Sequence, residues 1–98
     1  MSGLRFEWDE AKADSNARKH GVSFPEAATV FEDEAAVLVG DPDHSDAEDR
    51  FILLGHSSGR RRLLIVVHCY REEDEVIRVI SARRATRPES KQYTEVLQ

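Results

Sequence analysis

Arginine is concentrated in the second half of this chain, in a pattern suited to holding phosphate. Seven of these residues flank a predicted turn or lie near the junction of the last predicted strand and helix: Arg60, Arg61, Arg62, Arg78, Arg83, Arg84 and Arg87. The guanidinium group stays protonated, and its planar fork of donors matches phosphate oxygens. A helix beginning just after residue 86 adds free N–H groups at its N-terminus, which favour anions. The pattern predicts a surface that binds a phosphodiester, with Arg side chains that merely neutralise neighbouring acids as the alternative.

RNA cleavage without a metal is the reaction that these groups suit. The 2′-hydroxyl attacks its own phosphate, so the enzyme must align the reacting groups, neutralise growing charge and move two protons. Arginine supplies the neutralising charge, but its high pKa excludes it as the base. The titratable candidates are His20, His68, Tyr70 and Glu48, and their spacing does not choose among them.

The predicted strand over residues 62–70 decides where two of these groups point. Side chains alternate along a strand, which separates Leu64, Val66, His68 and Tyr70 from Leu63, Ile65, Val67 and Cys69. Because the second set is apolar apart from one thiol, we expect it to face the core and leave His68 and Tyr70 on a face that ends polar. A Tyr that closes the core and a hydrogen-bonded, half-buried His are the alternatives.

Metal and thiol chemistry receive less support. His44 lies beside Asp41 and Asp43, but it lacks the helical i, i+4 pair or the CxxC spacing of a specific metal site, so a turn explains this segment better. Cys69, the single cysteine, alternates away from His68, which predicts a buried and inert thiol. We therefore expect neither a metal nor a cofactor.

Length and composition bound the class of protein. With 98 residues, 40% hydrophobic and 34% charged, we expect one globular domain over residues 1–98. Residues 1–49 hold four basic and 13 acidic residues, a net of −9, whereas residues 50–98 hold ten basic and six acidic, a net of +4. A basic surface on an acidic protein follows from this division. The chain shows no membrane-spanning run and no signal peptide, so we expect a cytoplasmic protein.

The first half of the chain predicts one strand and two helices. Residues 4–8 alternate as a short strand, and Asp9 is placed to cap a helix over about residues 9–20 that ends at Gly21. Ser23 has the capping-box spacing to Glu26 and opens a second short helix.

The second half predicts a sheet and a final helix. The sequence pattern predicts four strands, over residues 36–39, 51–55, 62–70 and 76–81. Short turns join the last three, which are therefore expected to be antiparallel neighbours. Thr86 and Glu89 repeat the capping-box spacing and begin the last helix. This order predicts the α+β class: a small antiparallel sheet of four to five strands with two N-terminal helices and one C-terminal helix.

Two blocks of the sequence resemble the BrnT family of toxins from bacterial toxin–antitoxin pairs, which belongs to the RelE-like ribonuclease superfamily. The first block comprises residues 6–13, Asn16, residues 19–24, Glu26-Ala27, Val30-Phe31 and Asp33. The second comprises residues 43–45 and 48–50, Gly55, residues 77–86 and Tyr93.

The resemblance implies a RelE-like fold and a metal-independent endoribonuclease that slows translation. It also implies inhibition by a BrnA-type, ribbon-helix-helix antitoxin through which the complex would bind operator DNA. The implied functional positions are Lys19, His20, Arg50, Tyr70, Ser81 and Arg83.

We expect His20, Arg50, Tyr70, Ser81 and Arg83 to be catalytic. RNA binding is assigned to four further cations: Lys19, Arg62, Arg78 and Arg84. We further expect Arg83, His20 and Tyr70 to surround one shared cleft. A non-catalytic co-repressor that docks a DNA-binding antitoxin is the alternative function.

Overall fold

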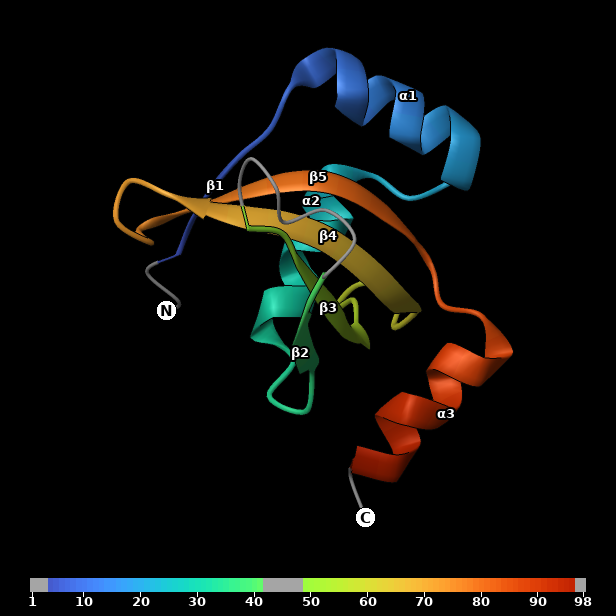
Figure 1. Ribbon diagram of the computed structural model, residues 1–98. Coiled ribbons are helices and arrows are strands. Elements are labelled where there is room, and N and C mark those ends of the chain that lie inside the picture. The colour runs from blue at the N-terminus through green and yellow to red at the C-terminus, as the bar shows by residue number, and fades with distance from the viewer. Residues whose placement is uncertain (1–3, 42–48, 97–98) are drawn as a thin grey trace.

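The computed structural model describes residues 4–41 and 49–96, which form three helices, a short 3-10 helix and five strands (Figure 1). In chain order these are β1 (Arg5–Glu7), α1 (Glu10–His20), α2 (Phe24–Thr29), η1 (Val30–Glu32), β2 (Val37–Gly40), β3 (Phe51–His56), β4 (Leu63–Arg71), β5 (Val76–Arg84) and α3 (Arg87–Val96). The predicted order and the α+β class are confirmed. Asp43, His44, Ser45 and Glu48, considered above, lie outside the described residues.

The five strands form one mixed sheet in the order β1-β5-β4-β3-β2. As predicted, β3, β4 and β5 are antiparallel neighbours. The prediction of an antiparallel sheet is wrong for β1, because Phe6 pairs with Ile77 in a parallel ladder at the edge of β5. Alternation in the sequence identifies a strand, but no hairpin turn joins β1 to its partner, so nothing local sets its direction.

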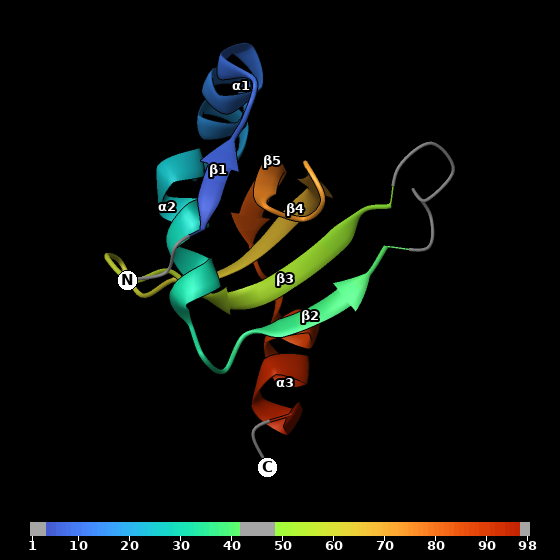
Figure 2. The same cartoon turned by 90° about the vertical axis from the view of Figure 1, so that its left-hand side faces the viewer.

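One face of the sheet, called here the helix face, is covered by α2. Phe24, Ala27 and Val30 pack there against Leu64, Val66 and other buried strand residues. Figure 2 shows α2 on this side of the strands and α3 at the lower end of the sheet.

The opposite face, called here the open face, is covered less completely. Tyr93 from α3 packs against Leu54 and Ile65 at one end. Beyond that end lies an apolar row across three strands, Val39, Ile52 and Val67, in which Val39 is 49% exposed.

The expected orientation of β4 is therefore wrong. Leu64, Val66 and His68 face the main core under α2, and His68 is fully buried, whereas the other set was expected to face the core. Both faces of β4 carry buried residues because α3 covers part of the second face. Alternation groups the side chains correctly, but only the packing of helices decides which group lies deeper.

Side-chain caps set the helix boundaries as predicted. The Asp9 carboxylate accepts from the Lys12 N–H at 3.1 Å, and Gly21 adopts the left-handed conformation (φ 69°) that ends α1. Thr86 and Glu89 form a reciprocal capping box at the start of α3. At α2 only half of the box forms, because Ser23 caps the Glu26 N–H whereas the Glu26 side chain bonds elsewhere.

Asn16 joins α1 to the outer edge of β5. Its amide donates to the Ala82 carbonyl at 2.8 Å, and its oxygen accepts from the Ala82 N–H at 3.1 Å. The same amide donates to the Val22 carbonyl at 2.9 Å. The Asn16 side chain thus supplies the hydrogen bonds that a neighbouring strand would give to β5 beyond the end of β1.

No helix in the described part of the chain is long and apolar enough to cross a membrane.

Candidate functional site

Four of the predicted site residues share the open face of the sheet. On β5, Arg78 pairs with Cys69, Ser81 with Val67 and Arg83 with Ile65, and each of these partners lies on the open face. Cross-strand partners project to the same side of a sheet, so the three β5 side chains do as well.

Arg50 joins them from the neighbouring strand. The Arg50 carbonyl accepts from the Asp41 N–H at 2.9 Å, so Arg50 continues the pairing of β3 with β2 by one step. Alternation from Ile52 then places its side chain on the open face.

A β-bulge brings Arg78 and Ser81 to the same side. Val67 pairs with Ser81 and His68 with Val79, so the ladder skips Ile80. In a regular strand, residues three positions apart point to opposite faces. The extra residue restores a common face for Arg78, Ser81 and Arg83, and the sequence carries no signal for it.

Glu7 organises the cations at one end of the open face. Its carboxylate accepts from Arg78 at 2.7 Å and lies 3.2 Å from the Arg71 Nε. This hydrogen bond raises the pKa of Arg78, which stays cationic. Glu7 was missed as a site residue; its alternation with Phe6 is the only sequence signal that it points away from the helix face.

Arg83 lies at the other end of this face and is held by α3. Its two terminal nitrogens donate to the two Glu89 oxygens at 2.9 and 2.8 Å. The hydrogen bond from Arg83 is the largest influence that lowers the pKa of Glu89 to about 2. Both groups are therefore charged at neutral pH, and the carboxylate occupies the donor fork that a phosphate would use.

Tyr70 lies on the helix face, paired with a buried histidine. Its hydroxyl is 3.2 Å from His68 Nε2, and His68 Nδ1 is 3.2 Å from the Val66 carbonyl. Because a carbonyl only accepts, Nδ1 carries the proton and Nε2 accepts from the Tyr70 hydroxyl. Burial lowers the pKa of His68 and raises the pKa of Tyr70, so both are neutral near pH 7.

The expectation of one cleft containing Arg83 and Tyr70 is wrong. Tyr70 pairs with Ile77, six positions along β5 from Arg83, which corresponds to roughly 20 Å of extended chain. The two side chains also project from opposite faces. Tyr70 instead lines a separate hollow of about 550 Å³ with Phe51 and two acids, Asp49 and Asp74.

The end of α1 lies at the same end of the sheet as Arg83. Arg62 leads into β4 and donates to the Gly21 carbonyl at 3.0 Å, and the start of β4 pairs with Arg83 and Arg84. Lys19 is exposed and His20 is half-buried, immediately before Gly21. Arg84 pairs with Leu64, so it projects to the helix face.

Comparison with known proteins decides the family. Residues 8–89 match the model of a family described as the ribonuclease toxin BrnT of type II toxin–antitoxin systems. The chain belongs to the BrnT family. Membership makes it a ribonuclease toxin of a type II system, and such systems include an antitoxin partner. A search of curated proteins finds no match.

In this BrnT-family chain, the predicted site residues fall into three places. The open face brings together Arg50, Arg78, Ser81 and Arg83. The end of α1 carries Lys19 and His20 next to Arg62, near the Arg83 end of the sheet. Tyr70 and Arg84 project to the helix face and belong to neither group.

Proposed function

We propose that this chain is a metal-independent endoribonuclease that cuts RNA on the open face and so inhibits translation in the cytoplasm. The observation that carries this proposal is the common orientation of Arg50, Arg78 and Arg83 around Ser81. Three guanidinium groups on one surface can bind successive phosphates of one RNA strand, and Arg83 supplies charge at the scissile phosphate. Membership of a ribonuclease family supports the same reaction.

The proposed chemistry needs no external nucleophile. The RNA 2′-oxygen forms a bond to the adjacent phosphorus, the bond from phosphorus to the 5′-oxygen breaks, and a 2′,3′-cyclic phosphate remains. One proton leaves the 2′-hydroxyl and another reaches the 5′-oxygen. Arg83 stabilises the phosphoryl oxygens and Ser81 donates a hydrogen bond to them. Arg78, at the other end of the face, binds a neighbouring phosphate of the same strand.

Of the proposed proton carriers, the structure favours His20 over Tyr70. Histidine changes charge near neutral pH, and His20 lies at the Arg83 end of the sheet. Tyr70 lies on the other face, and its hydroxyl bonds to His68. We therefore assign a proton-transfer role to His20 and keep Tyr70 as a weaker candidate.

The antitoxin in this proposal is of the BrnA kind, a ribbon-helix-helix protein, and the pair binds operator DNA through it. The mixed sheet and three helices are compatible with the RelE-like grouping expected from the sequence. One observation favours the alternative of a non-catalytic co-repressor: Glu89 already occupies the fork of Arg83.

RNA cleavage by the purified chain in the presence of EDTA tests the proposal. Arg83→Ala is expected to remove about 2 to 4 kcal/mol of transition-state stabilisation, which lowers the cleavage rate roughly 30- to 1,000-fold. Lys91→Ala is the matched control, because Lys91 is an exposed cation on α3 with no ion pair within the described residues. Cleavage that requires a divalent ion contradicts the mechanism. Absence of turnover, combined with altered operator affinity of the complex, identifies the co-repressor.

A further inference from the structure

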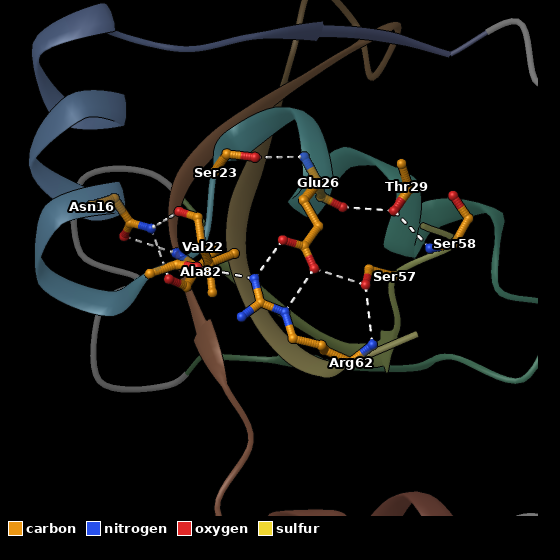
Figure 3. Close-up of polar contacts among 10 residues, drawn as sticks. Asn16, Val22, Ser23, Glu26, Thr29, Ser57, Ser58, Arg62 and Ala82 are labelled. Carbon is orange, nitrogen blue, oxygen red and sulfur yellow. Dashed lines mark hydrogen bonds and ion pairs between the residues drawn. The ribbon is translucent and has the colours of Figure 1, made fainter. Parts of the chain in front are cut away.

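We propose that Arg62 is a positioning residue that fixes the end of α1, and hence His20, instead of contacting RNA. This inference rests on the proposed function, in which His20 transfers a proton. It replaces the RNA-binding role that the sequence predicted for Arg62. Arg62 lies in a polar network that joins three separate parts of the chain (Figure 3).

The guanidinium of Arg62 is engaged on two sides. Its Nε and one terminal nitrogen donate to the two Glu26 oxygens at 3.0 and 2.5 Å, in a bidentate pair. The same terminal nitrogen donates to the Gly21 carbonyl at 3.0 Å. The fork that would recognise a phosphate is thus committed to α2 and to the end of α1.

The network around Arg62 is shielded from solvent and includes a third side chain. The Arg62 and Glu26 side chains are only 17% and 13% exposed. Ser57, which is buried, donates to Glu26 at 2.9 Å and accepts from the Arg62 N–H at 3.2 Å. The hydrogen bond from Arg62 is the main influence that lowers the pKa of Glu26. Releasing Arg62 to an RNA phosphate would leave a shielded carboxylate without its cation, which is costly.

The contact at Gly21 is what connects this network to His20. Gly21 ends α1 in the left-handed conformation, and its N–H bonds to the Ala17 carbonyl at 2.9 Å. Its carbonyl is held by Arg62, so both sides of the residue after His20 are fixed. Proton transfer requires the donor and acceptor to be placed to within a fraction of an ångström. Loss of this anchor therefore lowers the rate of cleavage more than it weakens RNA binding.

Four variants separate positioning from RNA contact. Glu26→Gln is the decisive one, because it removes the negative charge and one of the two acceptors that hold Arg62, without removing the cation. If Arg62 positions His20, then Glu26→Gln, Arg62→Lys and Arg62→Ala each lower kcat by about 10- to 100-fold with KM within about twofold. Lys91→Ala removes an exposed cation on α3 that has no ion pair within the described residues, and leaves kcat unchanged.

An NMR measurement provides a readout independent of catalysis. The imidazole signals of His20 are expected to shift in Glu26→Gln and Arg62→Lys but not in Lys91→Ala, at temperatures where urea titration shows each variant folded. Unchanged His20 signals, or Glu26→Gln with wild-type kcat and tighter RNA binding, overturn the positioning role. If the wild type itself fails to cleave RNA, the proposed function fails, whereas the His20 signals still decide whether Arg62 fixes the end of α1.

Discussion

Glu89 determines how Arg83 meets a phosphate. Both Arg83 terminal nitrogens donate to this carboxylate, which also accepts from the Thr86 N–H at 2.8 Å. An RNA phosphate therefore has to displace Glu89 or share the guanidinium with it. The same contact holds the first turn of α3 against the end of β5, so the cation and the helix are coupled.

Substituting Glu89 by Gln should change how the unfolding free energy depends on pH. The folded pKa of Glu89 is about 2, below the ordinary 4.5, so the unfolded state takes up the proton first as pH falls. The stabilisation is complete above about pH 5 and is lost progressively towards pH 2. Because Arg83 is 41% exposed, we expect Glu89→Gln to cost only about 1 kcal/mol of unfolding free energy at pH 7.

Urea unfolding at pH 7, 4 and 2 measures this effect. Gln still accepts from the Thr86 N–H, so the capping box is retained and the change isolates the charge. The difference from wild type should shrink from pH 7 to pH 4 and again to pH 2. Glu95→Gln, at an exposed position on the same helix, is the control and should unfold like wild type. A cost for Glu89→Gln that is independent of pH contradicts the ionic explanation.

His68 shows why a residue's type is a weak guide to its role. The sequence presents it as a candidate base, whereas the structure buries it completely against Phe31 and Phe51. Burial lowers its pKa, so it stays neutral. Its ring nitrogens form hydrogen bonds with the Val66 carbonyl and the Tyr70 hydroxyl instead of facing solvent. Alternation along β4 gave no means of predicting this, because both of its faces contain apolar residues.

At the scale of elements, Asn16 closes the part of β5 that β1 leaves open. We expect Asn16→Ala to lower the unfolding free energy by roughly 2 to 3 kcal/mol, because the N–H and carbonyl of Ala82 then lie buried without their partner. Urea unfolding measures the loss. Ser15→Ala, at an exposed neighbour on α1, is the control and should change stability little. A loss in Asn16→Ala no larger than in Ser15→Ala contradicts this role.

The elements themselves were largely predictable, but their arrangement was not. Caps at Asp9, Ser23 and Thr86 are local hydrogen bonds between neighbours in sequence, so the helix starts were evident. The parallel pairing of β1 and the bulge at Ile80 depend on partners more than ten positions away. The bulge decides that Arg78, Ser81 and Arg83 share a face, and the pairing of β1 brings Glu7 to Arg78.

For the whole molecule, charge is uneven enough that RNA binding should depend on salt despite a net charge of −5. If about three phosphates meet Arg50, Arg78 and Arg83, the logarithm of the affinity should fall against the logarithm of salt with a slope of about −2. A 2′-O-methyl RNA lacks the attacking hydroxyl, so its binding can be measured without cleavage. Lys91→Ala should keep the slope, and Arg78→Ala should reduce its magnitude. A slope near zero contradicts binding through phosphates on the open face.

The sequence by itself determined the α+β class, the helix caps, the three antiparallel strands and the family. These follow from local periodicity, local hydrogen bonds and near-continuous motifs. Only the tertiary structure decided that Tyr70 lies far from Arg83, that Arg62 is bound to Glu26, and that Glu7 and Glu89 hold the cations of the open face. Each of these facts depends on which face a strand presents and which distant side chain meets it. Residue type and spacing do not carry that information, because it arises when the helices pack onto the sheet.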